Sequence, residues 1–236
     1  MQDFFHEPKM VKIPEGWSLI GNIDKNIDFE DLSAKQIYID YAFSMGKYTI
    51  TTKEYIYFAN EVNEHYPDWF PNKGAMYQNH DLSDNSPIVG VSYYDAEAYS
   101  KWLSLKTNKE YRLPTEEEWE YVARAGSNTQ WCFGNDESLL KDYAWYLNNS
   151  SATIHPVGEK KANDWGIHDM HGNVFEWCTN WYSSSYDVKT EVKKEKMLRG
   201  GSWIYTALLT SSGYRDAQFP DRKNDAIGFR ILRIEE

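Results

Sequence analysis

Apolar positions in the first half of the chain repeat with two different periods. Residues 10–14 and 17–21 form short apolar runs, and residues 36–43 alternate between apolar and polar side chains. An alternation with a period of two is typical of a half-buried strand. Residues 53–62 and 93–107 instead place apolar side chains three and four positions apart, which predicts two amphipathic helices.

Capping residues stand at the expected helix starts. Thr51 or Thr52 precedes the first helical pattern, and Ser92 precedes the second. Thr115 begins a third helix, with Glu118 in the position that completes a capping box. We therefore expect three helices that begin at these residues.

Less regular sequence fills the rest of the chain. Residues 88–91 predict a short strand before the second helix, whereas residues 64–86 carry the scattered Pro, Asn, Asp and Gly that are typical of a loop. From residue 127 onward the pattern predicts little helix. Because no internal repeat or linker interrupts the sequence, we expect one irregular, loop-rich α+β domain over residues 1–236, with its core between residues 10 and 234.

The C-terminal part places an irregular segment between two well-defined ends. Residues 198–203, with the sequence LRGGSW, precede the segment, and residues 227–232, with the sequence IGFRIL, follow it. The intervening residues mix aromatic, aliphatic, hydroxyl and charged side chains without a period, and they include no cysteine or histidine. A segment of this kind between fixed ends predicts a contact surface.

Composition narrows the classes of partner. The chain has 236 residues, 16% aromatic residues and a formal net charge of −11. Negative charge disfavours nucleic acid and anionic membrane surfaces, whereas it suits a bound cation. No segment is long and apolar enough to span a bilayer, and the N-terminus lacks an apolar run of signal-peptide length, so we expect no membrane insertion and, if this start is native, a cytoplasmic location.

The remaining reactive and charged side chains favour structural roles. Cys132 and Cys178 could pair, but without metal-spaced partners the pattern favours two buried thiols. We expect Arg199 and Arg230 to be buried and paired with acids at the ends of the C-terminal segment. Residues 116–118 are all glutamate, and we expect them to serve the helix start and a solvated helix face rather than acid–base catalysis.

Six motifs occur in an order that resembles a known family. They lie at residues 43–51, 87–96, 111–121, 166–177, 199–203 and 227–230. Together they resemble the formylglycine-generating enzyme, or sulfatase-modifying-factor, family over roughly residues 10 to 234. The resemblance implies a variant of the C-type lectin fold, which is a mixed and irregular α+β architecture.

The founding activity of that family depends on two cysteines that this chain lacks. The resemblance implies a copper site in which two cysteines follow the Gly-Gly-Ser motif shortly after Ser202. The matching positions hold Tyr205 and Thr210. Neither side chain offers the soft thiolate that Cu(I) prefers. We therefore expect the family fold without copper and without oxidation of a sulfatase cysteine to formylglycine.

The C-terminal segment also resembles the variable proteins of diversity-generating retroelements, in which a similar frame holds a binding surface. By this resemblance the ligand-binding positions are Trp203, Ile204, Tyr205, Thr206, Leu208, Leu209, Tyr214, Asp216, Ala217, Gln218, Phe219, Arg222, Asn224, Asp225 and Ala226. Large rings provide contact area at a low entropic cost, so Tyr205, Tyr214 and Phe219 are the expected anchors. The ligand is either a protein or a small molecule.

A calcium site is the cofactor that the resemblance implies. Asp169 and Glu176 would provide side-chain oxygen, and Gly172 and Val174 would provide carbonyl oxygen, which are the ligands that Ca²⁺ prefers. The alternative is a Gly-Asn turn whose acids accept hydrogen bonds from local backbone N–H groups.

Function is predicted as non-catalytic ligand binding at the C-terminal segment. One alternative is an oxidoreductase of the same family with changed chemistry, centred on Ser202 and Tyr205. A second alternative is a regulatory or scaffold module that acts with an enzyme partner.

Overall fold

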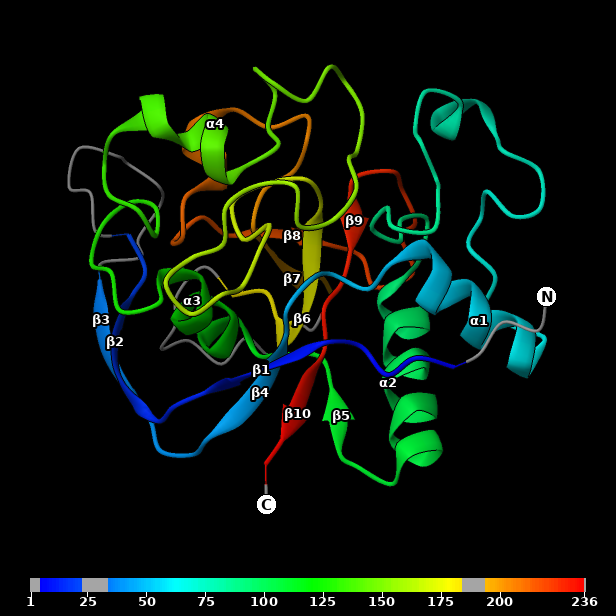
Figure 1. The fold of residues 1–236 in the computed structure, drawn as a ribbon, viewed down its shortest axis with the longest axis horizontal. Helices are drawn as coiled ribbons and strands as arrows, with labels where there is room; N and C mark the ends of the chain where they lie inside the picture. Colours follow the sequence, from blue (N-terminus) through cyan, green and yellow to red (C-terminus); the bar gives the residue numbers. More distant parts are fainter. Residues whose placement is uncertain (1–4, 23–33, 184–193, 236) are drawn as a thin grey trace.

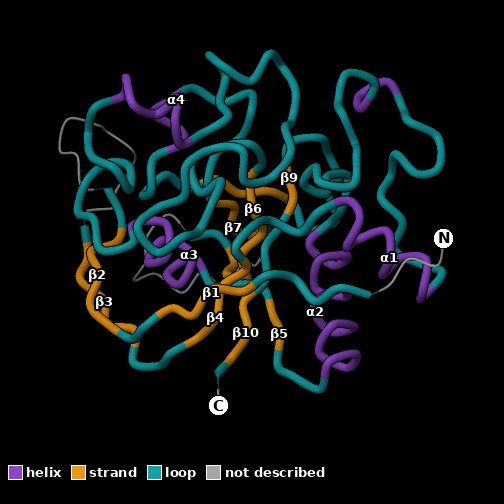
Figure 2. The backbone as a smooth tube through the Cα atoms, viewed as in Figure 1, coloured by secondary structure: helices purple, strands orange, loops and turns teal. Residues whose placement is uncertain are grey.

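The computed structural model describes residues 5–22, 34–183 and 194–235, and Figure 1 shows their arrangement. Over these residues the α-helices are α1 (Thr52–Val62), α2 (Tyr93–Thr107), α3 (Glu116–Arg124) and α4 (Leu140–Tyr143). Short 3₁₀ turns occur at Ala75–Tyr77, Glu137–Leu139 and Ala207–Thr210. Most of the remaining chain is loop (Figure 2), as the sequence predicts.

Strands are short, and they fall into three sheets. They are β1 (Met10–Ile13), β2 (Gly16–Ile20), β3 (Lys35–Ile39), β4 (Phe43–Gly46), β5 (Tyr111–Arg112), β6 (Phe175–Trp181), β7 (Lys196–Arg199), β8 (Asp216–Gln218), β9 (Ile227–Gly228) and β10 (Leu232–Ile234). One antiparallel sheet has the order β1-β4-β10-β5, and a second has the order β8-β7-β6-β9 with β6 and β9 parallel. The hairpin β2-β3 forms the third.

The three predicted helix starts are confirmed. Thr51, Ser92 and Thr115 each accept a hydrogen bond from the backbone N–H three residues later, and each takes part in a complete capping box. Each helix ends at a residue in the left-handed conformation. These local signals fix where the helices begin. In the folded chain α1 and α2 lie on one side of the central strands and α3 on the other (Figure 1).

Two strand predictions are corrected. Residues 88–91 are buried but form no regular strand, since only the preceding Pro87 pairs with Thr51, in an isolated bridge. The pattern at 36–43 predicts one strand, but β3 ends at Ile39 and β4 begins at Phe43. Buried apolar residues satisfy the same sequence pattern whether or not a ladder partner is present.

Buried ion pairs connect the sheets to α3, as predicted for the two arginines. Arg199 and Arg230 are fully buried. Arg199 pairs with Glu120 on α3, and Arg230 pairs with Glu176 on β6 at 2.7 Å between Nε and Oε2. The expectation of a solvated glutamate face on α3 is wrong for Glu116, which is buried and pairs with Arg215 at 2.7 Å.

Both cysteines are free thiols. Cys178 is buried and Cys132 is partly buried. Within residues 5–22, 34–183 and 194–235, no helix has the length and apolar character needed to cross a membrane.

Candidate functional site

The C-terminal surface, defined here as residues 203–226, is built on loops whose backbone is held by buried groups. The Arg199 guanidinium donates to the carbonyls of Tyr214 and Ser212 at 2.8 and 2.9 Å. Because Arg199 is itself fixed by Glu120, these bonds hold the turn at 211–214 without regular secondary structure.

A second set of contacts fixes the 3₁₀ turn at Ala207–Thr210. Thr210 is buried, and its hydroxyl donates to the carbonyl of Ala207 at 2.7 Å. His171 Nδ1 lies 2.9 Å from the carbonyl of Thr210, and Ala207 packs in a buried cluster with Trp131. The turn therefore presents its remaining side chains to solvent from a fixed backbone.

Apolar side chains are exposed on this fixed backbone. Ile204, Leu208 and Phe219 are 48%, 37% and 52% exposed. Thr206 and Arg222 are also exposed, whereas the following predicted positions are partly buried: Tyr205, Leu209, Tyr214, Asp216, Ala217, Gln218, Asn224, Asp225 and Ala226. All of the predicted ligand-binding positions except Trp203 are thus at least partly accessible.

Trp203 is a correction to the predicted surface. Its side chain is only 8% exposed, its indole N–H donates to the carbonyl of Asp225 at 3.1 Å, and its ring packs edge-on against His80. His80 Nε2 in turn lies 3.0 Å from Asp225 Oδ2. Trp203 therefore supports the surface from below, because its indole N–H is bonded to Asp225 and its ring packs against His80.

Tyr205, Tyr214 and Asp216 form the polar part of the surface. The Tyr205 hydroxyl donates to Asp216 at 3.2 Å, and both tyrosine rings pack on Phe175. Burial and the nearby Asp216 carboxylate raise the pKa of both tyrosines, and burial also raises the pKa of Asp216. The tyrosines are therefore hydrogen-bond donors at neutral pH rather than nucleophiles.

One neighbouring side chain was missed by sequence reasoning. Leu147 is 47% exposed, and its backbone N–H donates to the carbonyl of Tyr205 at 2.9 Å. Leu147 therefore places a further exposed apolar residue next to the backbone of Tyr205. It lies far from this segment in the sequence, so no local pattern could have found it.

The predicted calcium ligands do not converge on an open site. Both oxygens of Glu176 accept hydrogen bonds from Arg230 at 2.7 Å, and one also accepts a bond from the Trp119 indole. Asp169 Oδ2 accepts a hydrogen bond from Gly158, and the Gly172 carbonyl accepts one from Val174. Of the four carboxylate oxygens of Asp169 and Glu176, Asp169 Oδ1 is the one that is buried without a hydrogen-bond partner in the described structure.

Calcium at this turn would require Arg230 to leave Glu176, so the four residues do not fit the ion as they stand. Across the part of the chain that the structure describes, no group of three or more His, Cys, Asp and Glu side chains is placed to hold a metal. The calcium site therefore stays a prediction from the resemblance.

Comparison with known proteins identifies the family. A sequence model of the sulfatase-modifying factor enzyme 1-like domain matches residues 2–234. The chain belongs to this family. PvdO from Pseudomonas aeruginosa has a similar structure, with a TM-score of 0.86 and 28% identity over 97% of this chain and 95% of PvdO. The predicted C-type-lectin-like α+β fold is confirmed.

Relatives differ in how much of them this sulfatase-modifying-factor domain spans. The chaperone protein LppX of Paenibacillus barcinonensis is 28% identical over 89% of this chain and 82% of LppX. The serine/threonine-protein kinase pkn1 of Chlamydia caviae is 32% identical over 62% of this chain, which covers 24% of the kinase. Treponema denticola variable protein 1 shares the fold, with a TM-score of 0.79 and 24% identity over 96% of this chain and 95% of that protein.

The residues at the copper positions of the family do not fit that metal. The Tyr205 hydroxyl donates a hydrogen bond to the Asp216 carboxylate. Thr210 is buried, and its hydroxyl donates to the carbonyl of Ala207. Burial raises the pKa of the Cys132 thiol to about 12 and that of Cys178 well above its usual value, so neither is a ready thiolate. Ser202 is also fully buried, and its hydroxyl has no hydrogen-bond partner in the described structure.

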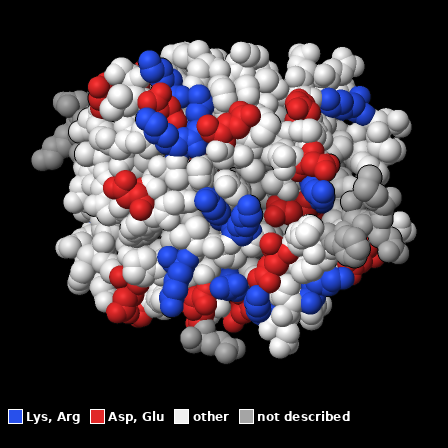
Figure 3. Space-filling view, viewed as in Figure 1, with Lys and Arg blue, Asp and Glu red and all other residues white. Residues whose placement is uncertain are grey.

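Charge on the molecular surface is mixed. On the face that Figure 3 shows, basic and acidic side chains are interspersed, with no broad basic area. This face thus offers no extended positive surface of the kind that phosphate backbones attract.

Proposed function

We propose that this sulfatase-modifying-factor domain is a non-catalytic binding domain, and that its ligand contacts the C-terminal surface. One observation carries the proposal. Ile204, Leu208 and Phe219 are exposed on a backbone that buried Arg199, Thr210 and Trp203 hold in place. Exposed apolar side chains on a preordered backbone can serve as the anchors of a recognition surface.

Preorganisation explains why such a surface is useful. A loop that must become ordered on binding loses part of the interaction energy to conformational entropy. Here the buried hydrogen bonds of Arg199 have already ordered the backbone at 211–214. Tyr205, Tyr214 and Asp216 then supply hydrogen bonds beside the apolar contacts.

A protein ligand is the better supported alternative. LppX, which is named a chaperone protein, matches most of this chain over most of its own length. The kinase match places a similar domain within a longer enzyme. Both observations favour a domain that works on or beside another protein, which includes the regulatory or scaffold role.

Site-specific photo-cross-linking tests the proposal. A photoreactive amino acid replaces Leu208 in the full chain, and the matched control replaces Leu105, which is 87% exposed on α2. We expect one protein from the native host extract to cross-link at position 208 and not at 105. The cross-link should be lost when Ile204 and Phe219 are both changed to serine.

Two results would contradict the proposal. One is equal cross-linking at positions 208 and 105, which would indicate nonspecific apolar contact. The other is conversion of a cysteine-containing sulfatase peptide to formylglycine by the purified protein with copper, which would favour the oxidoreductase alternative.

Diversification of this surface has a separate test. If the segment varies as in the retroelement proteins that it resembles, gene sequences from many isolates should differ at Ile204, Thr206 and Phe219. They should agree over residues 199–203 and 227–230. Differences spread evenly over the chain would argue against diversification and leave the binding proposal unaffected.

A further inference from the structure

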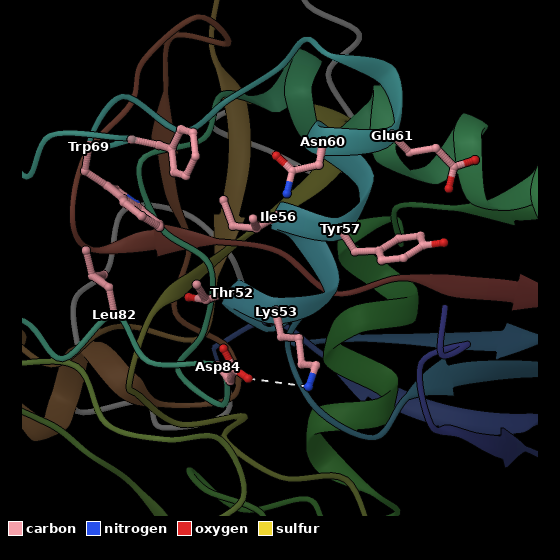
Figure 4. Close-up of a pocket in the computed structure, with 10 residues that line it drawn as sticks. Thr52, Lys53, Ile56, Tyr57, Asn60, Glu61, Trp69, Leu82 and Asp84 are labelled. Atoms are coloured by element: carbon pink, nitrogen blue, oxygen red, sulfur yellow. Dashed lines mark ion pairs between the residues drawn. The ribbon is translucent and has the colours of Figure 1, made fainter. Parts of the chain in front are cut away.

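A cleft is lined entirely by residues outside the C-terminal surface. It has a volume of about 540 Å³ and lies between α1 and the loop at 64–86, and Figure 4 shows its lining. Pockets that bind small molecules occupy roughly 300–1,000 Å³ and combine apolar walls with a few polar groups. The volume of the cleft falls within this range.

One stripe of α1 forms the first wall. Thr52, Ile56 and Asn60 are four residues apart, so they share one face of the helix. Lys53 and Glu61 lie on the adjacent stripe and also line the cleft. The wall is thus apolar at its centre, at Ile56, and polar towards both ends.

Two aromatic side chains from the loop form the opposite wall. The Trp69 ring is fixed, because its indole N–H donates to the carbonyl of Val89 at 2.8 Å. Phe70 stacks on Tyr66 with the ring centroids 4.8 Å apart. Trp69 and Leu82 lie across the cleft from Ile56 (Figure 4), and Phe70 lines the same cleft.

Backbone hydrogen bonds keep the two walls in place. The N–H groups of Thr52 and Lys53 donate to the carbonyls of Ser86 and Asp84 at 2.8 and 3.1 Å. These bonds fasten the end of the loop to the start of α1. The cleft is therefore preformed, and a ligand need not order the loop.

Two of the residues that line the cleft form an ion pair with each other. Lys53 Nζ lies 3.4 Å from Asp84 Oδ2, and both side chains are largely exposed (Figure 4). An exposed pair of this kind contributes little to stability, so each partner is free to exchange the other for a ligand charge. The pair offers one positive and one negative group in the lining of the same cleft.

We propose that the cleft binds a free α-amino acid with an aromatic or large apolar side chain. The side chain lies between Ile56, Trp69 and Leu82. The α-carboxylate pairs with Lys53 and the α-ammonium with Asp84, so the charges of the zwitterion replace those that the two residues give each other. None of the residues that line the cleft belongs to the C-terminal surface.

Isothermal titration with four related probes tests each part of the proposal. L-tryptophan carries both charges, tryptamine only the ammonium, indole-3-propionate only the carboxylate, and indole neither. We expect L-tryptophan to bind at one site per chain with a dissociation constant of roughly 1 mM or below. Each singly charged analogue should bind about threefold to fivefold more weakly, and indole should bind weakest.

Variants assign the two charges. Asp84→Asn should remove the advantage of tryptophan over indole-3-propionate, and Lys53→Gln should remove its advantage over tryptamine. Ile56→Trp should fill the cleft and abolish binding of all four probes. The matched control is Lys101→Gln, which breaks the exposed Lys101–Glu97 pair on α2 and should change nothing.

Three outcomes would overturn the proposal: no saturation by tryptophan up to about 10 mM, equal affinity for all four probes, or tight binding that Ile56→Trp leaves intact. Circular dichroism of each variant confirms that the fold is retained. Because Leu208 does not line the cleft, cross-linking at position 208 and tryptophan binding succeed or fail separately.

Discussion

Glu176 is fully buried, and both of its carboxylate oxygens accept hydrogen bonds. Arg230 donates to both of its oxygens, and Arg230 also donates to the carbonyls of Gly46 and His168 at 2.9 Å. Removing one partner of a buried ion pair leaves the other charge without compensation, which is more costly than losing an exposed pair. Arg230, held by Glu176, therefore connects β6 with β4 and with the loop that precedes β6.

We expect Glu176→Gln to lower the free energy of unfolding by about 3–5 kcal/mol. Chemical denaturation, with calcium and with a chelator, measures the change. The exposed Glu97→Gln variant is the control and should stay within about 0.5 kcal/mol of the wild type. If the chelator destabilised the wild type and not Glu176→Gln, the calcium site would be supported and the purely structural role would be wrong.

The two thiols should be unreactive in the folded protein. Burial raises the pKa of Cys132 to about 12 and that of Cys178 well above its usual value, so the thiolate is scarce near pH 8. We expect slow reaction of both with a thiol reagent in buffer and fast reaction of both in denaturant. Rapid labelling of native Cys132 would show that its surroundings open readily.

At the residue scale, the sequence predicted burial correctly where the residue type itself implies its partner. It failed where burial depends on a residue that is distant in the sequence. Arg199 and Arg230 lie at the two ends of the C-terminal segment, and both were predicted to be buried and paired with acidic side chains. Both are buried. The burial of Trp203 depends on His80, and that of Glu116 depends on Arg215. These partners are far apart in the sequence, so no local pattern reports them.

At the scale of elements, α3 has a start that does more than cap a helix. Thr115 accepts the N–H of Glu118, and the Glu118 carboxylate accepts the N–H of Thr115 and also pairs with Arg112 from β5. The capping box therefore ties the helix to the strand before it.

Thr115→Ala should lower the free energy of unfolding by about 1–2 kcal/mol, since the N–H of Glu118 loses its acceptor. Thr115→Ser keeps an acceptor hydroxyl and should cost much less. Thermal unfolding of both variants checks this difference. Equal losses for alanine and serine would show that the threonine methyl group, and not the hydrogen bond, stabilises the helix start.

Elements with local signals were predictable, and those made by tertiary contacts were not. Capping boxes lie within four residues, which is why the starts of α1, α2 and α3 could be placed. Residues 88–91 have the composition of a strand, yet they lie buried without a ladder partner. The cleft was missed because Ile56 and Trp69 belong to different elements, each with an ordinary sequence.

On the scale of the whole molecule, the last strand holds one sheet together. β10 lies between β4 and β5, with Leu232 opposite Met45 on one side and Arg112 on the other. Leu232 is fully buried. The sheet therefore joins the N-terminal strands, the start of α3 and the end of the chain in a single unit.

Leu232→Ala should lower the free energy of unfolding by about 2–5 kcal/mol, because it opens a cavity in the middle of this sheet. Leu105→Ala, at an exposed position, should have an effect below about 0.5 kcal/mol. Deleting residues 232–236 should abolish cooperative unfolding. A truncated chain that still unfolded in one sharp transition would show that β4 and β5 do not need β10.

The position of β10 also determines when its sheet can be completed during translation. β4 is translated well before its neighbour β10, so an edge that is buried in the native sheet stays open until β10 has been made. An open strand edge invites pairing with other chains. Completion of this sheet must therefore wait for β10, and the folding yield should depend on how well nascent chains are kept apart until then.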